Sequence, residues 1–211
     1  MPTVAIVSQK GGSGKTTLTL HLGAAAAYNG KTPCVIDTDP QATASAWGDW
    51  RGDFQPEIVT SPPARLEKTI AKLVDKGCGF VLIDTPPHGE TASREAVRVA
   101  DLVLIPARPR AFDLHALEGT ADMIASMDTP AYVLFNGLPA GATQMLAEAT
   151  EFAENAGLKV CPVQFGERAA FHRSSATGEV AQESDPEGKA AGEVDALWKW
   201  TCKQLGIKAR K

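Results

Sequence analysis

Short apolar runs alternate with longer amphipathic segments along the whole chain. The apolar runs are rich in β-branched residues and are hydrophobic at both odd and even positions, which is typical of strands covered on both faces. The strand candidates are residues 3–8, 33–37, 57–60, 80–84, 102–106, 131–135 and 159–165. All of them are far shorter than the roughly 20 residues that a membrane-spanning helix needs. The pattern therefore predicts a sheet that is buried on both faces.

The segments between these strands have helical patterns. The helix candidates are residues 16–29, 63–76, 91–100, 113–127, 143–156 and 187–205. Gly30, Gly77 and Gly157 follow three of them at the position of a C-terminal cap. Residues 166–188 are the least regular part, and we expect a short helix and a loop there. Since strand–helix alternation requires crossover connections, we expect residues 1–211 to form a single α/β domain, with a mostly parallel twisted sheet and helices on both faces.

Composition narrows the class of protein further. The N-terminus lacks a charged segment followed by a cleavage site, so we expect a cytoplasmic protein. Cys34, Cys78, Cys161 and Cys202 are far apart and form no CxxC motif or Cys/His cluster, which favours buried, reduced thiols over a metal site. The net charge of −4 argues against a surface that is basic throughout, but it is compatible with a local basic patch.

A glycine-rich loop, QKGGSGKTT (residues 9–17), joins the first strand to the first helix. Glycines let backbone N–H groups curl around phosphates, and the helix N-terminus adds positive potential. Lys15 would reach the β- and γ-phosphates of a nucleotide, and the Thr16 hydroxyl would ligate Mg²⁺. The strict P-loop pattern has Gly where this chain has Gln9. The candidate nucleotide-binding residues of the loop are Lys10, Gly11, Gly12, Ser13, Gly14, Lys15, Thr16 and Thr17.

Aspartates end two of the predicted strands. Asp37 and Asp39 lie in VIDTDPQ after the second strand, and Asp84 ends the fourth in FVLIDTPP. Open parallel sheets bind ligands at the C-terminal ends of their strands. Asp84 therefore resembles a Walker-B acid that holds Mg²⁺ directly or through water. Asp37 also has a structural interpretation, as the cap of a helix or turn.

The loop departs from the strict pattern in an informative way. KGGSGKTT resembles the deviant Walker-A signature of the ParA/MinD superfamily, in which a second lysine precedes the glycine pair and reaches the partner's nucleotide across a dimer. The resemblance gives that role to Lys10, which would supply charge in trans much as an arginine finger does. DTDPQ resembles the family's switch, so Asp39 would position the attacking water and Asp37 would support Mg²⁺. The catalytic residues implied are Lys10, Lys15 and Asp39, with Thr16, Asp37 and Asp84 at the metal.

The resemblance covers nearly all of the chain. Residues 102–117 and 171–194 also resemble segments of the small ParA proteins. In related ATPases an asparagine after the sixth strand reads the adenine edge, and Asn136 stands there. A turn residue before Gly137 is the alternative interpretation. Because no winged-helix segment precedes the loop in this sequence, we expect the short, ParF-like subclass and no operator-specific autorepression.

Several partners follow from the resemblance. Short ParA proteins bind nonspecific DNA as ATP dimers, and a ParB-like or adaptor protein stimulates hydrolysis and release. We accordingly expect an ATP-dependent homodimer with bound Mg²⁺, nucleoid association in the ATP state, and slow hydrolysis without the partner. Affinity for DNA rises exponentially with the number of phosphates that are neutralised, and each contact adds about −0.9 to the slope of log affinity against log salt concentration. Two copies of a basic patch therefore bind DNA far better than one. The candidates for DNA contacts are Arg168, Arg173, Lys199, Lys203, Lys208, Arg210 and Lys211.

Other functions stay open. In a MinD-like membrane switch, the C-terminus could be anchored to lipid by Trp198, Trp200, Leu205 and Ile207, which lie beside lysines. We favour DNA over membrane because Val194, Leu197, Trp198 and Leu205 have the spacing of a stripe that would pack on the sheet. A metabolic ligase would need a second substrate pocket, and a nitrogenase-reductase-like carrier would need cluster cysteines. A module that binds ATP without hydrolysis is a further alternative. The sequence does not specify the cargo, whether plasmid, chromosomal locus or large protein assembly.

Overall fold

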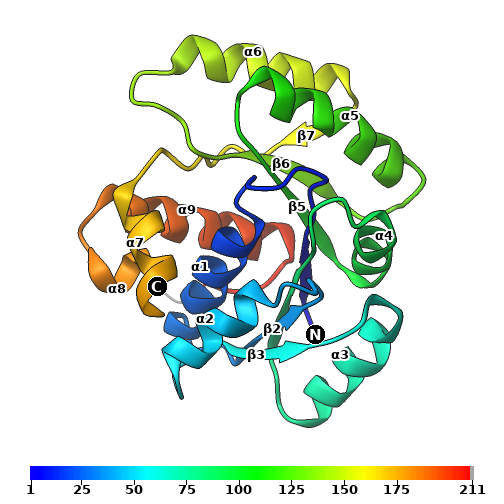
Figure 1. Ribbon diagram of the computed structural model, residues 1–211, viewed down its shortest axis with the longest axis vertical. Coiled ribbons are helices and arrows are strands. Elements are labelled where there is room, and N and C mark those ends of the chain that lie inside the picture. Colours follow the sequence, from blue (N-terminus) through cyan, green and yellow to red (C-terminus); the bar gives the residue numbers. More distant parts are fainter. Residues whose placement is uncertain (210–211) are drawn as a thin grey trace.

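A seven-stranded sheet runs through the middle of the molecule (Figure 1). The computed structural model describes residues 1–209, apart from the side chains of residues 174–176. The strands are β1 (Thr3–Ile6), β2 (Pro33–Asp37), β3 (Glu57–Thr60), β4 (Phe80–Asp84), β5 (Leu102–Ala107), β6 (Ala131–Phe135) and β7 (Lys159–Val160). They lie in the order β3-β2-β4-β1-β5-β6-β7, and all neighbours are parallel. The chain order reverses around β1, which is where open parallel sheets bind ligands.

Helices cover both faces of this sheet (Figure 1). One face carries α1 (Lys15–Tyr28), α2 (Thr43–Arg51), α7 (Ala169–Thr177), α8 (Ala181–Ser184) and α9 (Lys189–Gln204). The other carries the 3-10 turn η1 (Pro63–Arg65), α3 (Leu66–Asp75), α4 (Glu90–Val99), α5 (Ala111–Ala125) and α6 (Thr143–Asn155). Alternate residues of one strand face the two layers: Val4 and Ile6 join the first core, and Ala5 joins the second. This arrangement confirms the predicted α/β fold. It also explains why the strands are apolar at both odd and even positions.

Most predicted elements are confirmed, including the helix ends. Gly30, Gly77 and Gly157 have φ values of 74°, 85° and 79°, the left-handed conformation of a C-terminal cap. The last predicted strand was too long. It ends at Val160, and Pro162 has no N–H for the ladder. Two more bonds reach β6 beyond that end, from Cys161 N to Val133 O at 2.8 Å and from Phe165 N to Phe135 O at 2.9 Å.

The helix α2 was not predicted. It is only 9 residues long and contains Gly48, and small residues dominate its first turn. A usable signal was nevertheless present, because Ala44, Trp47 and Arg51 recur at helical spacing and are the three buried residues of this helix. The omission matters because α2 begins directly after the loop that carries Asp39.

The remaining expectations concern buried groups and the C-terminal helix. All four cysteines are buried free thiols, as predicted. On α9, Val194, Leu197 and Trp198 are at most 1% exposed, and Trp198 meets Phe80 edge-on at 5.3 Å between ring centroids. The predicted stripe therefore packs on the sheet. Among residues 1–209, none of the helices has both the length and the apolar character needed to cross a bilayer.

Candidate functional site

The loop between β1 and α1 has the conformation that its glycines predict. Gly12 and Gly14 have φ values of 72° and 95°, a region that glycine adopts without steric cost. A Cβ atom on Gly14 would collide with the Asn136 amide, so glycine is also needed there for close packing. Gly11 and Gly12 are exposed. Since α1 begins at Lys15, its unpaired N–H groups face the loop and favour an anion.

Two buried polar side chains in the loop lack the partners that a ligand would supply. Ser13 Oγ has no hydrogen-bond partner within the described part of the chain. Lys15 is 6% exposed, and its Nζ donates to Lys10 O at 3.1 Å. Burial lowers the pKa of Lys15, while attraction to Asp84 and Asp39 opposes that shift. A buried ammonium with unused donors fits the oxygen-rich phosphates of a nucleotide.

A carboxylate and a hydroxyl meet beside Lys15. Asp84 Oδ2 accepts a hydrogen bond from Thr16 Oγ1 at 2.7 Å, and Asp84 Oδ1 accepts one from Thr19 Oγ1 at 3.3 Å. Asp37 is the residue of β2 that pairs with Asp84 of β4. Burial raises the pKa of Asp84 to about 7, the Thr16 hydrogen bond opposes the rise, and Asp37 adds to it. Hard oxygens of this kind are the ligands that Mg²⁺ prefers, so the residues fit the ion.

Asp37 also performs the structural role that the sequence left open. Its Oδ2 accepts hydrogen bonds from Ser45 N and Ser45 Oγ, both at 3.0 Å, and its Oδ1 accepts one from Asp39 N at 3.0 Å. The side chain therefore secures the first turn of α2. Asp39 is half-buried, and its Oδ1 accepts from Gln41 N at 2.9 Å. The two aspartates of this loop thus differ: Asp37 is buried, whereas Asp39 is half-buried and its charge attracts the Lys15 ammonium.

Asn136 lies where the sequence predicted, in a pocket of about 260 Å³ beside the loop. Its Nδ2 donates to Ser13 O. The pocket is lined by residues that include Gly14, Thr17, Arg108, Asn136, Phe165 and Phe171. Sequence reasoning missed Arg108 and the two phenylalanines. Arg108 had a signal, because it follows β5 at the same edge of the sheet as the aspartates.

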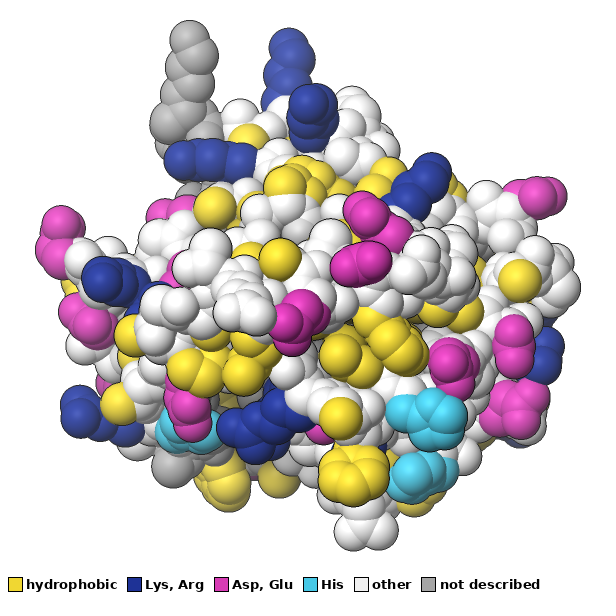
Figure 2. Space-filling view, turned by 90° about the horizontal axis from the view of Figure 1, so that it is seen from above, with side chains coloured by type: hydrophobic (Ala, Val, Ile, Leu, Met, Phe, Trp, Pro, Cys, Tyr) yellow, Lys and Arg dark blue, Asp and Glu magenta, His cyan; other side chains and the backbone are white. Residues whose placement is uncertain are grey.

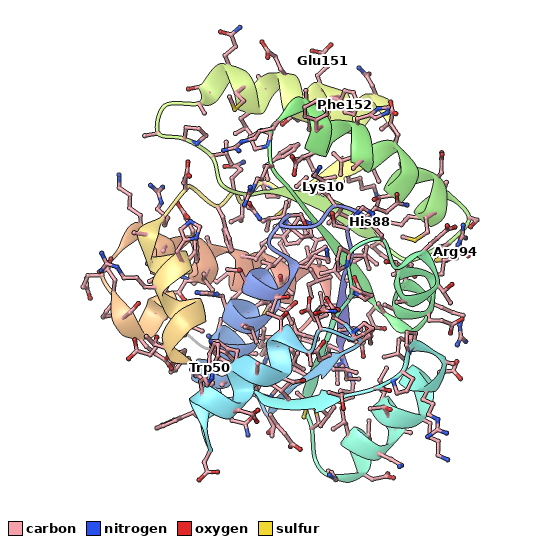
Figure 3. All side chains as sticks on the ribbon, in the orientation of Figure 1. Lys10, Trp50, His88, Arg94, Glu151 and Phe152 are labelled. Atoms are coloured by element: carbon pink, nitrogen blue, oxygen red, sulfur yellow. The ribbon has the colours of Figure 1, made fainter. Side chains whose placement is uncertain are left out.

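Lys10 lies in the loop after β1, near His88 (Figure 3). The two segments touch, because His88 N donates to Gln9 O at 3.1 Å. The Lys10 side chain is half-buried, and its ammonium has no carboxylate partner within residues 1–209. A cation without an internal partner is available to an anion outside the protomer.

The candidate DNA contacts fall into two groups. Arg168 and Arg173 border the same hollow, and Arg168 forms an ion pair with Glu193 at 2.6 Å. Lys199 and Lys203 are exposed on α9, four residues apart and hence on one helix face. The exposed Lys208 follows that helix, and Arg210 and Lys211 lie outside the described residues. Figure 2 shows several Lys and Arg side chains at the top of the face drawn and others at its sides and lower middle, with acidic side chains scattered over the same face.

Comparison with known proteins agrees with this geometry. Residues 4–181 match the CobQ/CobB/MinD/ParA nucleotide binding domain. Protein ParA of Rhizobium radiobacter is 34% identical over 116 residues, which cover 54% of this chain and 51% of that protein. Maintenance of carboxysome distribution protein A of Halothiobacillus neapolitanus is 32% identical over 128 residues, covering 59% and 58%. The chain thus spans little more than half the length of these relatives.

The fold is shared with solved structures. The septum site-determining protein MinD of Pyrococcus horikoshii, solved with Mg-ADP, superposes with a TM-score of 0.77. The superposition covers 100% of this chain and 99% of that one, at 20% sequence identity. At that identity the likeness concerns the fold alone.

Proposed function

Because this chain belongs to the CobQ/CobB/MinD/ParA family of nucleotide-binding domains, we propose that it is an ATPase that positions a cellular cargo through an ATP-dependent homodimer. The observation that carries the proposal is the pair of lysines in one loop. Lys15 is buried beside Asp84, whereas Lys10 has no acidic partner in the described structure. One cation serves the protomer's own nucleotide, and the other is available to the nucleotide of a second protomer.

The phosphates of ATP bind to the N–H groups of residues 10–17, with Lys15 at the β- and γ-phosphates. Thr16 and Asp84 would hold Mg²⁺, with Asp37 behind them, and the ion would supply positive charge to the phosphates. The base enters the pocket beside the loop, where Asn136 reads its edge. To bind the base, the Asn136 amide gives up its hydrogen bond to Ser13 O and makes hydrogen bonds to the base instead.

Asp39 positions the attacking water, and Lys10 of the second protomer supplies positive charge to the transferring phosphoryl group. Two observations support this role: the charge of Asp39 attracts the Lys15 ammonium, and Asp39 Oδ1 accepts a hydrogen bond from Gln41 N at 2.9 Å. A single half-buried carboxylate on a loop orients water poorly. Hydrolysis is therefore slow until a ParB-like or adaptor partner improves the geometry.

The dimer binds nonspecific DNA and keeps the protein on the nucleoid within the cytoplasm. Lys199, Lys203 and Lys208 support this, because they are exposed along and after one face of α9. Arg168 contributes less than an unpaired cation would, since it is held by Glu193. The membrane alternative is weakened by α9, whose apolar residues Val194, Leu197 and Trp198 are buried in the core.

Binding to a random-sequence DNA duplex tests the proposal. The protein is measured without nucleotide and with ADP, ATP or a nonhydrolysable ATP analogue, each at two salt concentrations. We expect binding only with the two triphosphates, and steep weakening with salt because counterions are released. The Lys15→Ala protein is the control and should bind in none of the four states. DNA binding that is equal in all states would refute the nucleotide switch, and liposome binding with ATP would favour the membrane alternative.

A further inference from the structure

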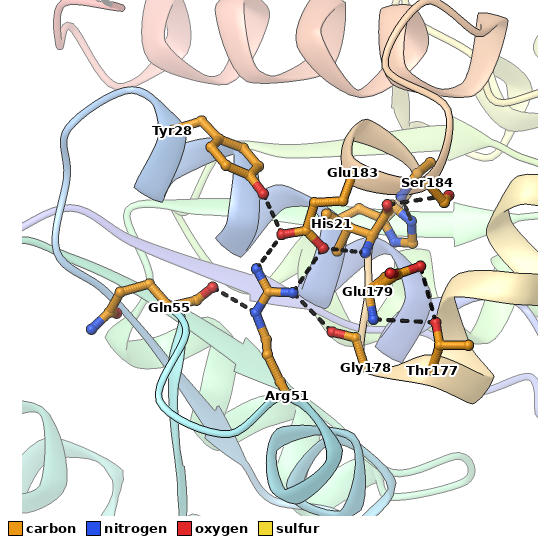
Figure 4. Close-up of polar contacts among 11 residues, drawn as sticks. His21, Tyr28, Arg51, Gln55, Thr177, Gly178, Glu179, Glu183 and Ser184 are labelled. Carbon is orange, nitrogen blue, oxygen red and sulfur yellow. Dashed lines mark hydrogen bonds and ion pairs between the residues drawn. The ribbon is translucent and has the colours of Figure 1, made fainter.

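The last residue of α2 is a buried arginine whose guanidinium donates four hydrogen bonds (Figure 4). Arg51 is 8% exposed, and its Nε donates to Gln55 O at 2.7 Å. Its Nη1 donates to Gly178 O at 2.8 Å and to Glu183 Oε2 at 3.0 Å, and its Nη2 donates to Glu183 Oε1 at 2.8 Å. The guanidinium also lies over the Trp47 ring, 4.8 Å from its centroid. A two-pronged pair of this kind fixes orientation as well as distance.

Glu183 connects α2 to two further helices. It belongs to α8, and its Oε2 accepts from Val180 N at 2.8 Å, which caps its own helix. Its Oε1 accepts from Tyr28 OH at the end of α1. Burial raises the pKa of Glu183, but the hydrogen bonds from Arg51, Tyr28 and Val180 outweigh it and leave the pKa below its usual value. The carboxylate is therefore ionised and holds α1, α2 and α8 together.

The turn between α7 and α8 fits closely against the end of α2. Gly178 has a φ of 74°, and a Cβ atom there would lie 2.8 Å from Trp50 C and from Arg51 N. A shift of this turn therefore pushes directly on the backbone of α2, because interiors transmit strain instead of yielding.

The opposite end of α7 reaches the proposed base pocket. Phe171 lines that pocket and stacks on Phe165 with ring centroids 5.0 Å apart. Phe171 also meets the ring of His21 edge-on at 5.0 Å, and His21 Nε2 accepts a hydrogen bond from Ala181 N at 3.1 Å. A base in the pocket would thus touch an aromatic side chain that is packed into the α7–α8 segment.

The other end of α2 reaches the proposed hydrolytic loop. Ser45 in its first turn bonds to Asp37, and Ala42 N donates to Asp39 O at 2.8 Å just before the helix starts. Ala42 has a φ of 53°, an unusual conformation for a residue with a Cβ atom. The helix α2 has 9 residues and is about 13 Å long. It connects the Asp39 loop at its start to Arg51 at its end.

From this continuous path we infer that Arg51 is a positioning residue, which couples occupancy of the base pocket to the placement of the Asp39 loop. The path runs from Phe171 through Gly178 and Glu183 to Arg51, and along α2 to Asp39. Coupling between sites is carried by packed side chains and hydrogen bonds that connect them. The inference rests on the proposed function, because it assigns the pocket to the base and Asp39 to hydrolysis. Its consequence is that a complete nucleotide orders the loop better than its phosphates alone.

Hydrogen–deuterium exchange of residues 38–46 in the full chain tests the coupling. The exchange is measured with a nonhydrolysable ATP analogue and with inorganic tripolyphosphate, both with Mg²⁺ and at saturating concentrations determined by calorimetry. In the wild-type protein we expect the analogue to slow exchange about fivefold or more beyond tripolyphosphate. In Arg51→Gln this base-dependent difference should disappear, while affinity for the analogue changes by less than about threefold.

Turnover supplies a second readout. Arg51→Gln should lower kcat for ATP about tenfold and leave KM within about threefold, because the residue acts on the placement of the loop and touches no phosphate. Arg51→Lys keeps the positive charge but not the planar guanidinium that makes two parallel hydrogen bonds. It should therefore restore less than half of the kcat that Arg51→Gln loses. If Arg51→Gln does not fold, Glu183→Gln replaces it, since that variant keeps one acceptor for Arg51.

A matched control separates coupling from general loss of stability. Leu73→Ala removes a buried side chain of α3 on the opposite face of the sheet and should lower the melting temperature while keeping the base-dependent exchange and kcat. Loss of the exchange difference in Leu73→Ala as well, or its retention in Arg51→Gln, would overturn the inference and leave the proposed function intact. A wild-type protein that neither binds the analogue nor hydrolyses ATP would refute the proposed function and the inference together.

Discussion

Acid should destabilise this protein through one histidine, His21 in the middle of α1. The side chain is 2% exposed, and its two ring nitrogens have opposite roles. Nδ1 lies 2.8 Å from Thr17 O, to which it donates, whereas Nε2 accepts from Ala181 N at 3.1 Å. Nε2 must be unprotonated to accept this hydrogen bond, so the folded state requires the neutral imidazole ring. A second proton would face the N–H of Ala181 and break the contact between α1 and α8.

The size of the effect follows from the pKa. Burial lowers the pKa of His21 from 6.5 to about 4, the Thr17 hydrogen bond and Glu183 oppose this shift, and Arg51 adds to it. Since the folded pKa lies below the unfolded one, the unfolded chain takes up the proton first as the pH falls. The contribution of neutral His21 to the free energy of unfolding is fully present above about pH 6.5 and is lost progressively down to pH 4. At about 1.4 kcal/mol per pKa unit, the step from pH 7 to pH 5 costs about 2 kcal/mol.

Urea unfolding at pH 7 and pH 5 measures this cost. His21→Gln cannot titrate, so its loss of stability between the two pH values should be about 2 kcal/mol smaller than that of the wild-type protein. His115→Gln is the matched control, because the His115 side chain is 83% exposed beside Glu118, and it should behave like wild type. Equal losses in the wild-type and His21→Gln proteins would refute the assignment of a neutral, hydrogen-bonded His21.

Four further substitutions test the site and its neighbours. Lys15→Ala should weaken ATP binding by more than about a hundredfold in calorimetry, because it removes a phosphate-binding charge; affinity within tenfold of wild type would contradict this role. Lys10→Ala should bind ATP but stay monomeric in light scattering, and an unchanged ATP dimer would exclude the in-trans lysine. Asp39→Ala should dimerise with ATP but release no phosphate, so a monomer would count against its role. Gly178→Ala should lower unfolding stability by about 2 kcal/mol, since its φ of 74° and its contact with α2 exclude a Cβ atom, and unchanged stability would disprove that fit.

The sequence by itself determined the features that depend on neighbouring residues. The loop of residues 9–17 needs only its glycines, its lysine and the strand and helix that flank it, and all of these are contiguous in the chain. Asp84 could be predicted because an aspartate that ends a buried parallel strand must lie at the ligand-binding edge of the sheet. The pairing of Asp37 with Asp84 in neighbouring strands agrees with that rule.

Only the tertiary structure decided how distant segments meet. Arg51 and Glu183 are 132 residues apart, and nothing local in either segment specifies the other as its partner. The base pocket likewise combines residues from the loop, from the ends of β5 and β6, and from α7, so Phe171 could not be assigned to it from its own neighbourhood. Local backbone chemistry follows from adjacent residues, whereas contacts of this kind depend on how whole helices pack against the sheet. That is why the Arg51–Glu183 pair became visible only in three dimensions, whereas α2 had a signal in the spacing of Ala44, Trp47 and Arg51.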